Sequence, residues 1–382
     1  MERIYLDWNA TAPVWPEAVE AVAACLRGTW GNPSSLHEEG RRAAEEADRA
    51  REALADWTRT RAGEWILTSG GTESIHAALH GTAAARPGRT RLVTSRGEHA
   101  CTLGVASELE ARGWEVVRVG LGADGAWDPA EVLEAADPAR TALVSLIWAN
   151  NETGAVSPVS ELARALKTRR IPLHLDAVQC FGRLPVDLAE VPASLVSLSA
   201  HKFGAPKGIG ALFVRQGTPW TRWMQGGRQE RSRRGGTVNA PGAAGMRAAL
   251  ERTRLADLDG IRQGRDLLER LVLERIPGSR VVGSGGERLP NTTCLCLPGC
   301  DSSTLLDRLD ARGYAVASGS ACTSGSAEPS HVLLAMGMAP EDAHATLRIS
   351  TGPLTDFDMI PRFVETLAAE AEAVRARSIP IL

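Results

Sequence analysis

Seven short apolar runs between residues 65 and 214 constrain the fold more than any other feature of the sequence. Helix-like stretches separate several of them, for example at 73–85, 99–112 and 158–169. Alternation of this kind is typical of an α/β domain with a mainly parallel sheet, here expected to have seven strands. The expected strands are WILT (65–68), RLVTS (91–95), EVVRV (115–119), ALVSLI (142–147), IPLHL (171–175), SLVSLS (194–199) and GALFV (210–214).

The last run is expected to lie antiparallel to its neighbour. Only a short glycine-rich connection separates it from the run before, and a parallel crossover needs a longer one. From about residue 246 the pattern turns helical, becomes strand-like near 280–297, and closes with a helix over 355–376. We therefore expect a large domain over residues 14–246 and a smaller α+β domain formed by residues 1–13 and 247–382.

Composition excludes several classes of protein. The 382-residue chain is 43% hydrophobic and 23% charged, which is an ordinary globular balance, and its net charge is −3. This charge argues against a nucleic-acid or anionic-membrane partner. No apolar run approaches the ~20 residues of a membrane helix, and MERIYLDWNA lacks the apolar region of a signal peptide. A cytoplasmic location is therefore expected.

The seven cysteines do not suggest a disulfide framework, because their number is odd and the chain is long. Three of them lie in CLCLPGC (294–300), which lacks a nearby histidine or a C-x-x-C spacing. We therefore interpret Cys294 and Cys296, which alternate like one face of a strand, as strand thiols and expect no metal. Cys322 differs. It lies in ASGSACTSGS (317–326), whose small polar residues and glycines are typical of a flexible loop. Taken alone, Cys322 is either a free cysteine that lies in a linker by chance or a reactive thiol that must move between two places.

Glycine and polar residues gather directly after five of the expected strands. Ligands of parallel α/β sheets bind at this edge, outside the carboxyl ends of the strands. Each signal alone is weak, since a lone histidine is often structural and an aspartate after a strand is often a helix cap. Together they supply an anion cup, an imidazole, amides, a carboxylate and a lysine. The residues are Gly71 with Thr72, His99, Asn151, Asp176 with Gln179, and Ser199 with His201 and Lys202.

This set of groups fits pyridoxal 5'-phosphate (PLP). The cofactor needs a lysine that holds it covalently, an acid for its pyridine nitrogen and a cup for its phosphate. Asp176 would hold the pyridine proton through a charge-assisted hydrogen bond. Lys202, partly desolvated beside His201, would have a lowered pKa and react as an amine. A dinucleotide-binding fold is the alternative, but no G-x-G-x-x-G follows the first strand.

Specific motifs run through nearly the whole chain, from YLDWNATAP (5–13) to about residue 376. In this pattern the chain resembles the cysteine desulfurases of the NifS/IscS kind, which belong to the class V aminotransferase group and have the PLP fold type I. The resemblance implies PLP-dependent removal of sulfur from L-cysteine, giving L-alanine and a persulfide. The other motifs are GNPSSLH (31–37), TSGGTES (68–74), NNETG (150–154), HLDAVQ (174–179), SAHKFGAPKGIGAL (199–212), GGRQERSRRGGT (226–237), SGSACTSG (318–325) and LRIS (347–350).

The resemblance also implies a role for each candidate residue. Cys322 would be the nucleophile that receives the sulfur and passes it to an acceptor protein, and His99 would stack on the cofactor ring and move protons. Arg348 and Asn151 would bind the substrate. Thr237 would reach the phosphate held by a second copy, which implies a homodimer. The implied PLP contacts are Lys202 (covalent), Asp176 (pyridine nitrogen), Gln179 and Asn151 (phenolic oxygen), and Gly71, Thr72, Ser199 and His201 (phosphate).

Other functions stay open at this point. A selenocysteine lyase, an aminotransferase or a catalytically silent binding subunit would use the same scaffold, and Cys322 favours sulfur chemistry among them. The basic run RQERSRR (228–234) is typical of a nucleic-acid site, but its flanking glycines and Thr237 favour a loop at the active site of a dimer. The sulfur acceptor is equally open, with iron–sulfur cluster biogenesis, tRNA thiolation, cofactor sulfuration and DNA sulfur modification as candidates.

Overall fold

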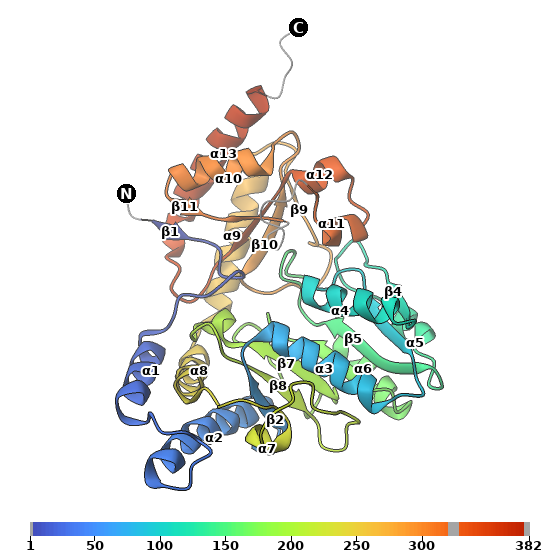
Figure 1. Cartoon of the computed structure of the whole chain (residues 1–382). Coiled ribbons are helices and arrows are strands. Elements are labelled where there is room, and N and C mark those ends of the chain that lie inside the picture. Colours follow the sequence, from blue (N-terminus) through green and yellow to red (C-terminus); the bar gives the residue numbers. More distant parts are fainter. Residues whose placement is uncertain (1–2, 320–327, 378–382) are drawn as a thin grey trace.

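The computed structural model describes residues 3–319 and 328–377, and its largest element is a seven-stranded mixed sheet (Figure 1). Five neighbouring strands are parallel, and β8 runs antiparallel to both of its neighbours. This confirms the α/β class, the seven expected strands and the antiparallel direction of the last one. The strand order is β2 (Trp65–Thr68), β8 (Gly210–Val214), β7 (Leu195–Ser199), β6 (Leu173–Asp176), β5 (Thr141–Ile147), β3 (Arg91–Ser95) and β4 (Glu115–Val119).

Helices cover both faces of this sheet, which explains why its strands are apolar runs without alternation. Successive side chains of a strand point to opposite faces. Thus Ile66 packs in the cluster that includes Ile75 of α3, whereas Leu67 packs in the cluster that includes Leu162 of α6. On one side lie α3 (Gly71–Ala85) and α4 (Ala100–Ala111), and on the other α5 (Pro129–Ala135) and α6 (Val159–Thr168).

Three further helices pack together beside the sheet, namely α1 (Pro16–Gly28), α2 (Glu38–Thr58) and α8 (Ala240–Thr253). α2 has a buried alanine face, as its pattern predicts. The helical pattern expected from residue 246 is in fact two helices, because α8 begins earlier and α9 (Leu258–Arg275) starts at a new cap, Asp257. The predicted domain boundary lies inside α8, and the domain limits stay a prediction.

A second, four-stranded sheet forms from the C-terminal part of the chain. The side chains of β10 alternate between two apolar clusters: Leu295 packs with α9, α10 (Ser302–Ala311) and α13 (Ile360–Arg377), whereas Cys294 and Cys296 pack with α11 (His331–Ala335) and α12 (Pro340–His344). The two cysteines are therefore buried strand thiols, as expected. The strand order is β12 (Ala317–Ser318), β13 (Thr346–Ser350), β10 (Thr292–Cys296) and β9 (Arg280–Val281).

The N-terminal segment connects the two sheets. β1 (Ile4–Tyr5) pairs in parallel with β11 (Tyr314–Ala315), and Asp7 bridges to Ser350 at the end of β13. A few residues later, the N–H of Ala12 donates to the carbonyl of His201, just after β7. Residues 7–12 therefore cross from the small sheet to the polar edge of the large one. Within residues 3–319 and 328–377, no helix is both long and apolar enough to cross a membrane.

Candidate active site

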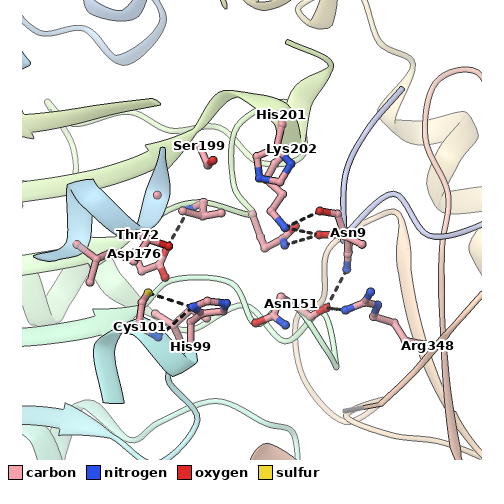
Figure 2. Close-up of a pocket in the computed structure, with 16 residues that line it drawn as sticks. Asn9, Thr72, His99, Cys101, Asn151, Asp176, Ser199, His201, Lys202 and Arg348 are labelled. Carbon is pink, nitrogen blue, oxygen red and sulfur yellow. Dashed lines mark hydrogen bonds between the residues drawn. The ribbon is translucent and has the colours of Figure 1, made fainter. Parts of the chain in front are cut away.

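The loops after five strands of the large sheet converge on one cavity of about 290 Å³ (Figure 2). Ten of the predicted site residues line it. Thr237 is exposed and does not line it, and Cys322 falls outside the described residues. Residues that sequence reasoning gave no role also line it, among them Asn9 and Cys101. The predicted residues at the cavity are Gly71, Thr72, His99, Asn151, Asp176, Gln179, Ser199, His201, Lys202 and Arg348.

The turn from β2 into α3 forms a cradle at one side of the cavity. Gly70 has a φ of 155°, a conformation that side chains other than glycine rarely adopt. A Cβ on Gly71 would lie 2.8 Å from Cγ2 of Val178, so this shape of the cradle requires a glycine at position 71. Free backbone N–H groups at the start of a helix attract anions, and the Thr72 side chain and Ser199 lie beside them.

Glu73, in the first turn of α3, does not compete with an anion in this cradle. Its carboxylate accepts two hydrogen bonds from Arg234, at 2.8 and 3.1 Å, and one from the N–H of Ser69 at 2.8 Å. Burial alone would raise the pKa of Glu73, but these donors outweigh it and the pKa is lower than usual. The negative charge is thus neutralised outside the cradle.

Asp176 places a buried carboxyl group at the end of β6. Its Oδ1 accepts a hydrogen bond from the N–H of Val178 at 3.0 Å, and the residue is only 4% exposed. Burial raises its pKa to about 6, although the Val178 N–H and the charge of Lys202 act in the opposite direction. A buried carboxylate normally has a cationic hydrogen-bond donor beside it. A protonated pyridine nitrogen would supply that donor, so Asp176, the cradle and a nearby lysine together fit PLP.

Lys202 reaches the cavity from η2 (Ala200–Phe203), directly after β7. Its Nζ donates to the carbonyl oxygens of Asn9 and Ala10 at 2.7 and 2.9 Å. Nε2 of Gln179 donates to the same Asn9 oxygen at 3.0 Å. The N-terminal segment thus holds both groups at the cavity. The motif YLDWNATAP was the available signal for this role of Asn9, but its letters do not say which residue faces a lysine 193 positions away.

His99 is held in one orientation at the start of α4. Its Nδ1 lies 3.2 Å from the backbone nitrogen and 3.0 Å from the Sγ of Cys101. Because the backbone N–H can only donate, Nδ1 is an acceptor and the ring proton is on Nε2. Burial and the charges of Lys202 and His331 lower the pKa of His99, so the ring is neutral at pH 7.

The Cys101 thiol is not a nucleophile in this environment. Burial, with a further contribution from the charge of Asp176, raises its pKa to about 12. Since the thiolate is the reactive form, Cys101 stays protonated at neutral pH. His201, on the opposite wall, is neutral as well, because burial and the charges of Lys202, Lys207 and Arg183 lower its pKa to about 4.

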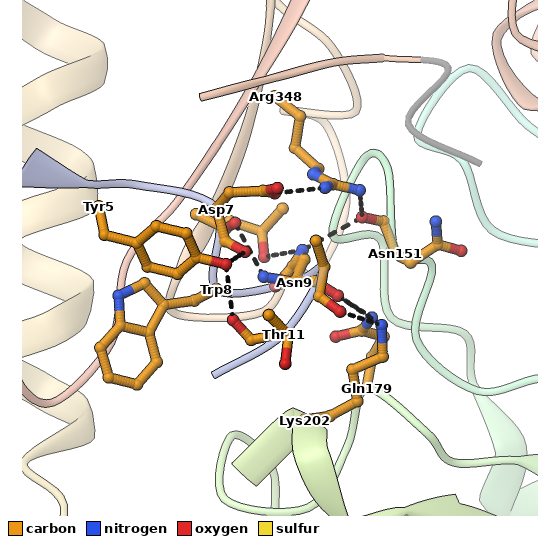
Figure 3. A network of polar contacts seen from close by, with 12 residues as sticks. Tyr5, Asp7, Trp8, Asn9, Thr11, Asn151, Gln179, Lys202 and Arg348 are labelled. Atoms are coloured by element: carbon orange, nitrogen blue, oxygen red, sulfur yellow. Dashed lines mark hydrogen bonds and ion pairs between the residues drawn. The ribbon is translucent and has the colours of Figure 1, made fainter. Parts of the chain in front are cut away.

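Arg348 joins the cavity from β13 of the small sheet (Figure 3). Its Nη2 donates to Oδ1 of Asp7 at 2.6 Å, and its Nη1 donates to the carbonyl of Asn151 at 3.1 Å. Its Nε is buried and has no hydrogen-bond partner among the described residues. The guanidinium is therefore fixed in position at the wall of the cavity, as a site for a small carboxylate requires.

The loop that carries Thr237 has an unusual backbone. Glu230, Arg231 and Ser232, the last three residues of α7 (Gln229–Ser232), have φ values of 48°, 57° and 63°. The carboxylate of Glu230 anchors this left-handed turn, since it pairs with Arg51 and accepts from the N–H of Leu67. The turn presents Thr237 to solvent, away from the cavity of its own chain.

Comparisons with known proteins agree with one another. The aminotransferase class-V family model matches residues 4–363. A cysteine desulfurase of Cereibacter sphaeroides is 43% identical over 99% of this chain and 98% of its own, and one of Trichormus azollae is 39% identical over 99% and 95%. A solved NifS-like protein superposes with a TM-score of 0.89 at 30% identity, covering 97% of this chain and all of that one. SspA in complex with cysteine gives 0.83 at 30% identity, covering 92% and 100%.

Proposed function

Because this chain belongs to the cysteine desulfurases of the class-V aminotransferase family, PLP-dependent enzymes with PLP fold type I, we propose that it removes sulfur from L-cysteine with PLP held by Lys202. The observation that carries the proposal is the convergence of Lys202, the buried Asp176 and the glycine cradle on one cavity. The related structure that holds cysteine supports this substrate. The reaction converts L-cysteine and an enzyme thiol into L-alanine and an enzyme persulfide.

Different residues of the cavity would contact different groups of the cofactor. The cradle of Gly71 and Thr72, with Ser199 and His201, would receive the phosphate. Asp176 would keep a proton on the pyridine nitrogen, and Gln179 and Asn151 would face the phenolic oxygen. When bound, PLP supplies an electron sink for the bond that breaks at the substrate α-carbon.

The substrate would be held from the side of the small sheet. Arg348 would bind its carboxylate, because the guanidinium lines the cavity, is already fixed by Asp7 and Asn151, and carries a second hydrogen on Nη1 and on Nη2. His99, neutral and protonated on Nε2, would donate a proton at the reacting atoms and accept one in return.

Cys322 would take the sulfur. Its thiolate would attack the substrate sulfur, so that a sulfur–sulfur bond forms as the carbon–sulfur bond breaks, and the carbon product leaves as alanine after protonation. The persulfide would then pass its outer sulfur to the thiol of an acceptor protein by exchange. The flexible-loop prediction for residues 317–326 falls largely on 320–327, outside the described residues, and stays a prediction.

A homodimer would complete the site. Thr237 is exposed and lies outside its own cavity, which suits a contact with the phosphate bound by a second copy. Trp30 and Leu36, which are 71% and 90% exposed, offer apolar surface of the kind that a partner copy covers. We further propose that the dimer acts in the cytoplasm and that one use of its sulfur is iron–sulfur cluster biogenesis.

The test is production of alanine and sulfide from L-cysteine by the purified, PLP-loaded protein in the presence of a thiol reductant. Cys322→Ala is expected to keep the visible absorption of bound PLP and to lose sulfide release, whereas Lys202→Ala loses the normal band. Cys25→Ala, a thiol on α1 away from the cavity, is the control and keeps both. Wild-type turnover by Cys322→Ala would refute the role of that thiol, and absence of PLP uptake would refute the proposal as a whole.

A further inference from the structure

Arg183 is a buried guanidinium beside the cavity that neither the sequence motifs nor the proposed reaction uses. The residue is 7% exposed, and no carboxylate within residues 3–319 and 328–377 forms an ion pair with it. Burial lowers its pKa to about 10, so it is still cationic at neutral pH. Burying a cation without an anionic partner costs free energy. The hydrogen bonds that Arg183 donates to neutral groups must therefore offset this cost.

One of these partners is the side-chain amide of Gln179. Nη1 of Arg183 donates to Oε1 of Gln179 and also, at 3.3 Å, to its backbone carbonyl. A guanidinium has donors only, so the amide atom that faces it must be the oxygen. The amide nitrogen must then point the other way, where it donates to the carbonyl of Asn9 at 3.0 Å with its second hydrogen still available. Gln179 lines the cavity, so the hydrogen bond from Arg183 fixes the orientation in which the amide nitrogen, and not the oxygen, is available there.

The other half of the guanidinium contacts the backbone. Nη2 donates to the carbonyls of Trp8 and Lys202, at 3.2 and 3.1 Å. Trp8 precedes Asn9, whose own carbonyl receives Nζ of Lys202 (Figure 3). A single planar group therefore connects the three chain segments that meet at the Asn9 oxygen. A lysine ammonium has no planar fork and would not reach all of these acceptors in one geometry.

Resting on the PLP site proposed above, we propose that Arg183 is a positioning residue that holds the Gln179 amide as a hydrogen-bond donor toward the phenolic oxygen of the cofactor. Without Arg183 the amide is free to rotate and to present its oxygen instead, which would oppose a negatively charged phenolic oxygen. The alternative is a field effect, in which the charge of Arg183 acts on the cofactor directly and Gln179 has no part.

A double-mutant cycle separates the two, with the pH midpoint of the visible band of the substrate-free holoenzyme as its readout. A donor to the phenolic oxygen favours the deprotonated form of the bound chromophore, so its loss raises the midpoint. Arg183→Met and Gln179→Leu are each expected to raise it by about one pH unit, which is the scale of one hydrogen bond. In the Gln179→Leu background, Arg183→Met is expected to cause no further shift. Additive shifts, or no shift in Arg183→Met, would overturn the inference.

Two further variants complete the design. Arg215→Met is the control, because Arg215 is half-buried and, among the described residues, donates to two carbonyls, those of Ala193 and Leu188 at 2.7 and 2.8 Å, away from the cavity. It is expected to leave the midpoint unchanged. Arg183→Lys keeps the charge but not the fork. It is expected to raise the midpoint, and it takes the place of Arg183→Met in the cycle if the methionine variant does not fold.

An unchanged midpoint in Arg183→Lys together with a raised one in Arg183→Met would assign the effect to charge and reject the positioning role. A wild-type protein without any PLP band would overturn the proposed cofactor site and this inference with it. A normal wild-type band with additive shifts would overturn the inference alone.

Discussion

The buried carboxylate of Asp176 lowers the stability of the cofactor-free protein at neutral pH. Its folded-state pKa of about 6 lies above the ordinary value of 3.8, so the folded chain binds this proton more tightly than the unfolded chain. The stability of the cofactor-free protein therefore falls as the pH rises from about 4 to 6, and the loss is complete above that range. The difference amounts to about 3 kcal/mol at neutral pH. This cost is consistent with the proposed role of the carboxylate, which is to hold a proton on the pyridine nitrogen of PLP.

Asp176→Asn is therefore expected to have opposite effects with and without PLP. Denaturant unfolding of the cofactor-free variant at pH 7.5 should show a gain of up to about 3 kcal/mol over wild type, which shrinks as the pH approaches 4. Alanine formation by the PLP-loaded variant should fall by at least about 100-fold, because a neutral amide does not hold the pyridine proton. A variant that is destabilised without PLP and keeps wild-type turnover would contradict this account of Asp176.

Residues of the site differed in how far the sequence could predict them. Lys202, Asp176 and His99 each follow a strand, and strand ends share one edge of a parallel sheet, so local pattern was enough to bring them together. Asp7, Asn9 and Arg183 act through contacts with distant parts of the chain, such as the pair of Asp7 and Arg348, 341 positions apart. No local pattern encodes which carbonyl or carboxylate will meet a given donor, and the role of Thr237 needs a second copy.

At the scale of elements, the proposed phosphate cradle depends on how closely β8 approaches the turn after β2. A Cβ on Gly210 would lie 2.7 Å from Cα of Gly70 and 2.7 Å from the carbonyl oxygen of Leu198. Both of these atoms belong to the backbone, so a side chain at position 210 would have to displace the turn at Gly70 or the strand β7. The first residue of β8 thus helps to shape a cradle that belongs to another strand.

Gly210→Ala is expected to push the Gly70 turn outward and to weaken PLP binding by about 10-fold or more, since the cradle loses its geometry. PLP affinity can be measured by titrating cofactor-free protein and following the visible band. Gly104→Ala is the matched control: this exposed glycine of α4 has open space around it, and the substitution should stabilise the helix by up to about 1 kcal/mol. Equal PLP affinity in both variants would show that β8 does not shape the cradle.

Elements were easier to predict than their junctions. The strands of the large sheet are apolar because helices bury both of their faces, and that signal is local. The division between α8 and α9 was missed because residues 254–257 carry no proline or glycine, and only the cap at Asp257 marks the new helix.

For the whole molecule, Asn9 is one residue that connects the two sheets. Its Nδ2 donates to Oγ1 of Thr292 at 2.9 Å and to the carbonyl of Asn151 at 3.1 Å, and its Oδ1 accepts from Nδ2 of Asn291 at 3.1 Å. The side chain is almost fully buried, at 1% exposure. These bonds fix the N-terminal segment between the element that carries Lys202 and the one that carries Arg348.

Asn9→Leu keeps the volume of this side chain and removes all three bonds. It is expected to cost about 3 kcal/mol or more, because the buried polar groups around it lose their partner. Thermal unfolding of the PLP-loaded protein measures the loss, and the KM for L-cysteine should rise as Arg348 shifts relative to Lys202. A stable variant with unchanged KM would show that Asn9 does not align the two sheets.

The position of the N-terminal segment also has a consequence in time. Asp7 is among the first residues that the ribosome makes, yet its partner Arg348 follows 341 residues later. At synthesis rates of about 5 to 20 residues per second, about 15 to 70 s pass between the synthesis of Asp7 and that of Arg348. All seven strands of the large sheet lie within residues 65–214, so the ribosome makes them well before Arg348. We therefore expect the proposed PLP cradle to form on the nascent chain before Arg348 can complete the substrate side of the cavity.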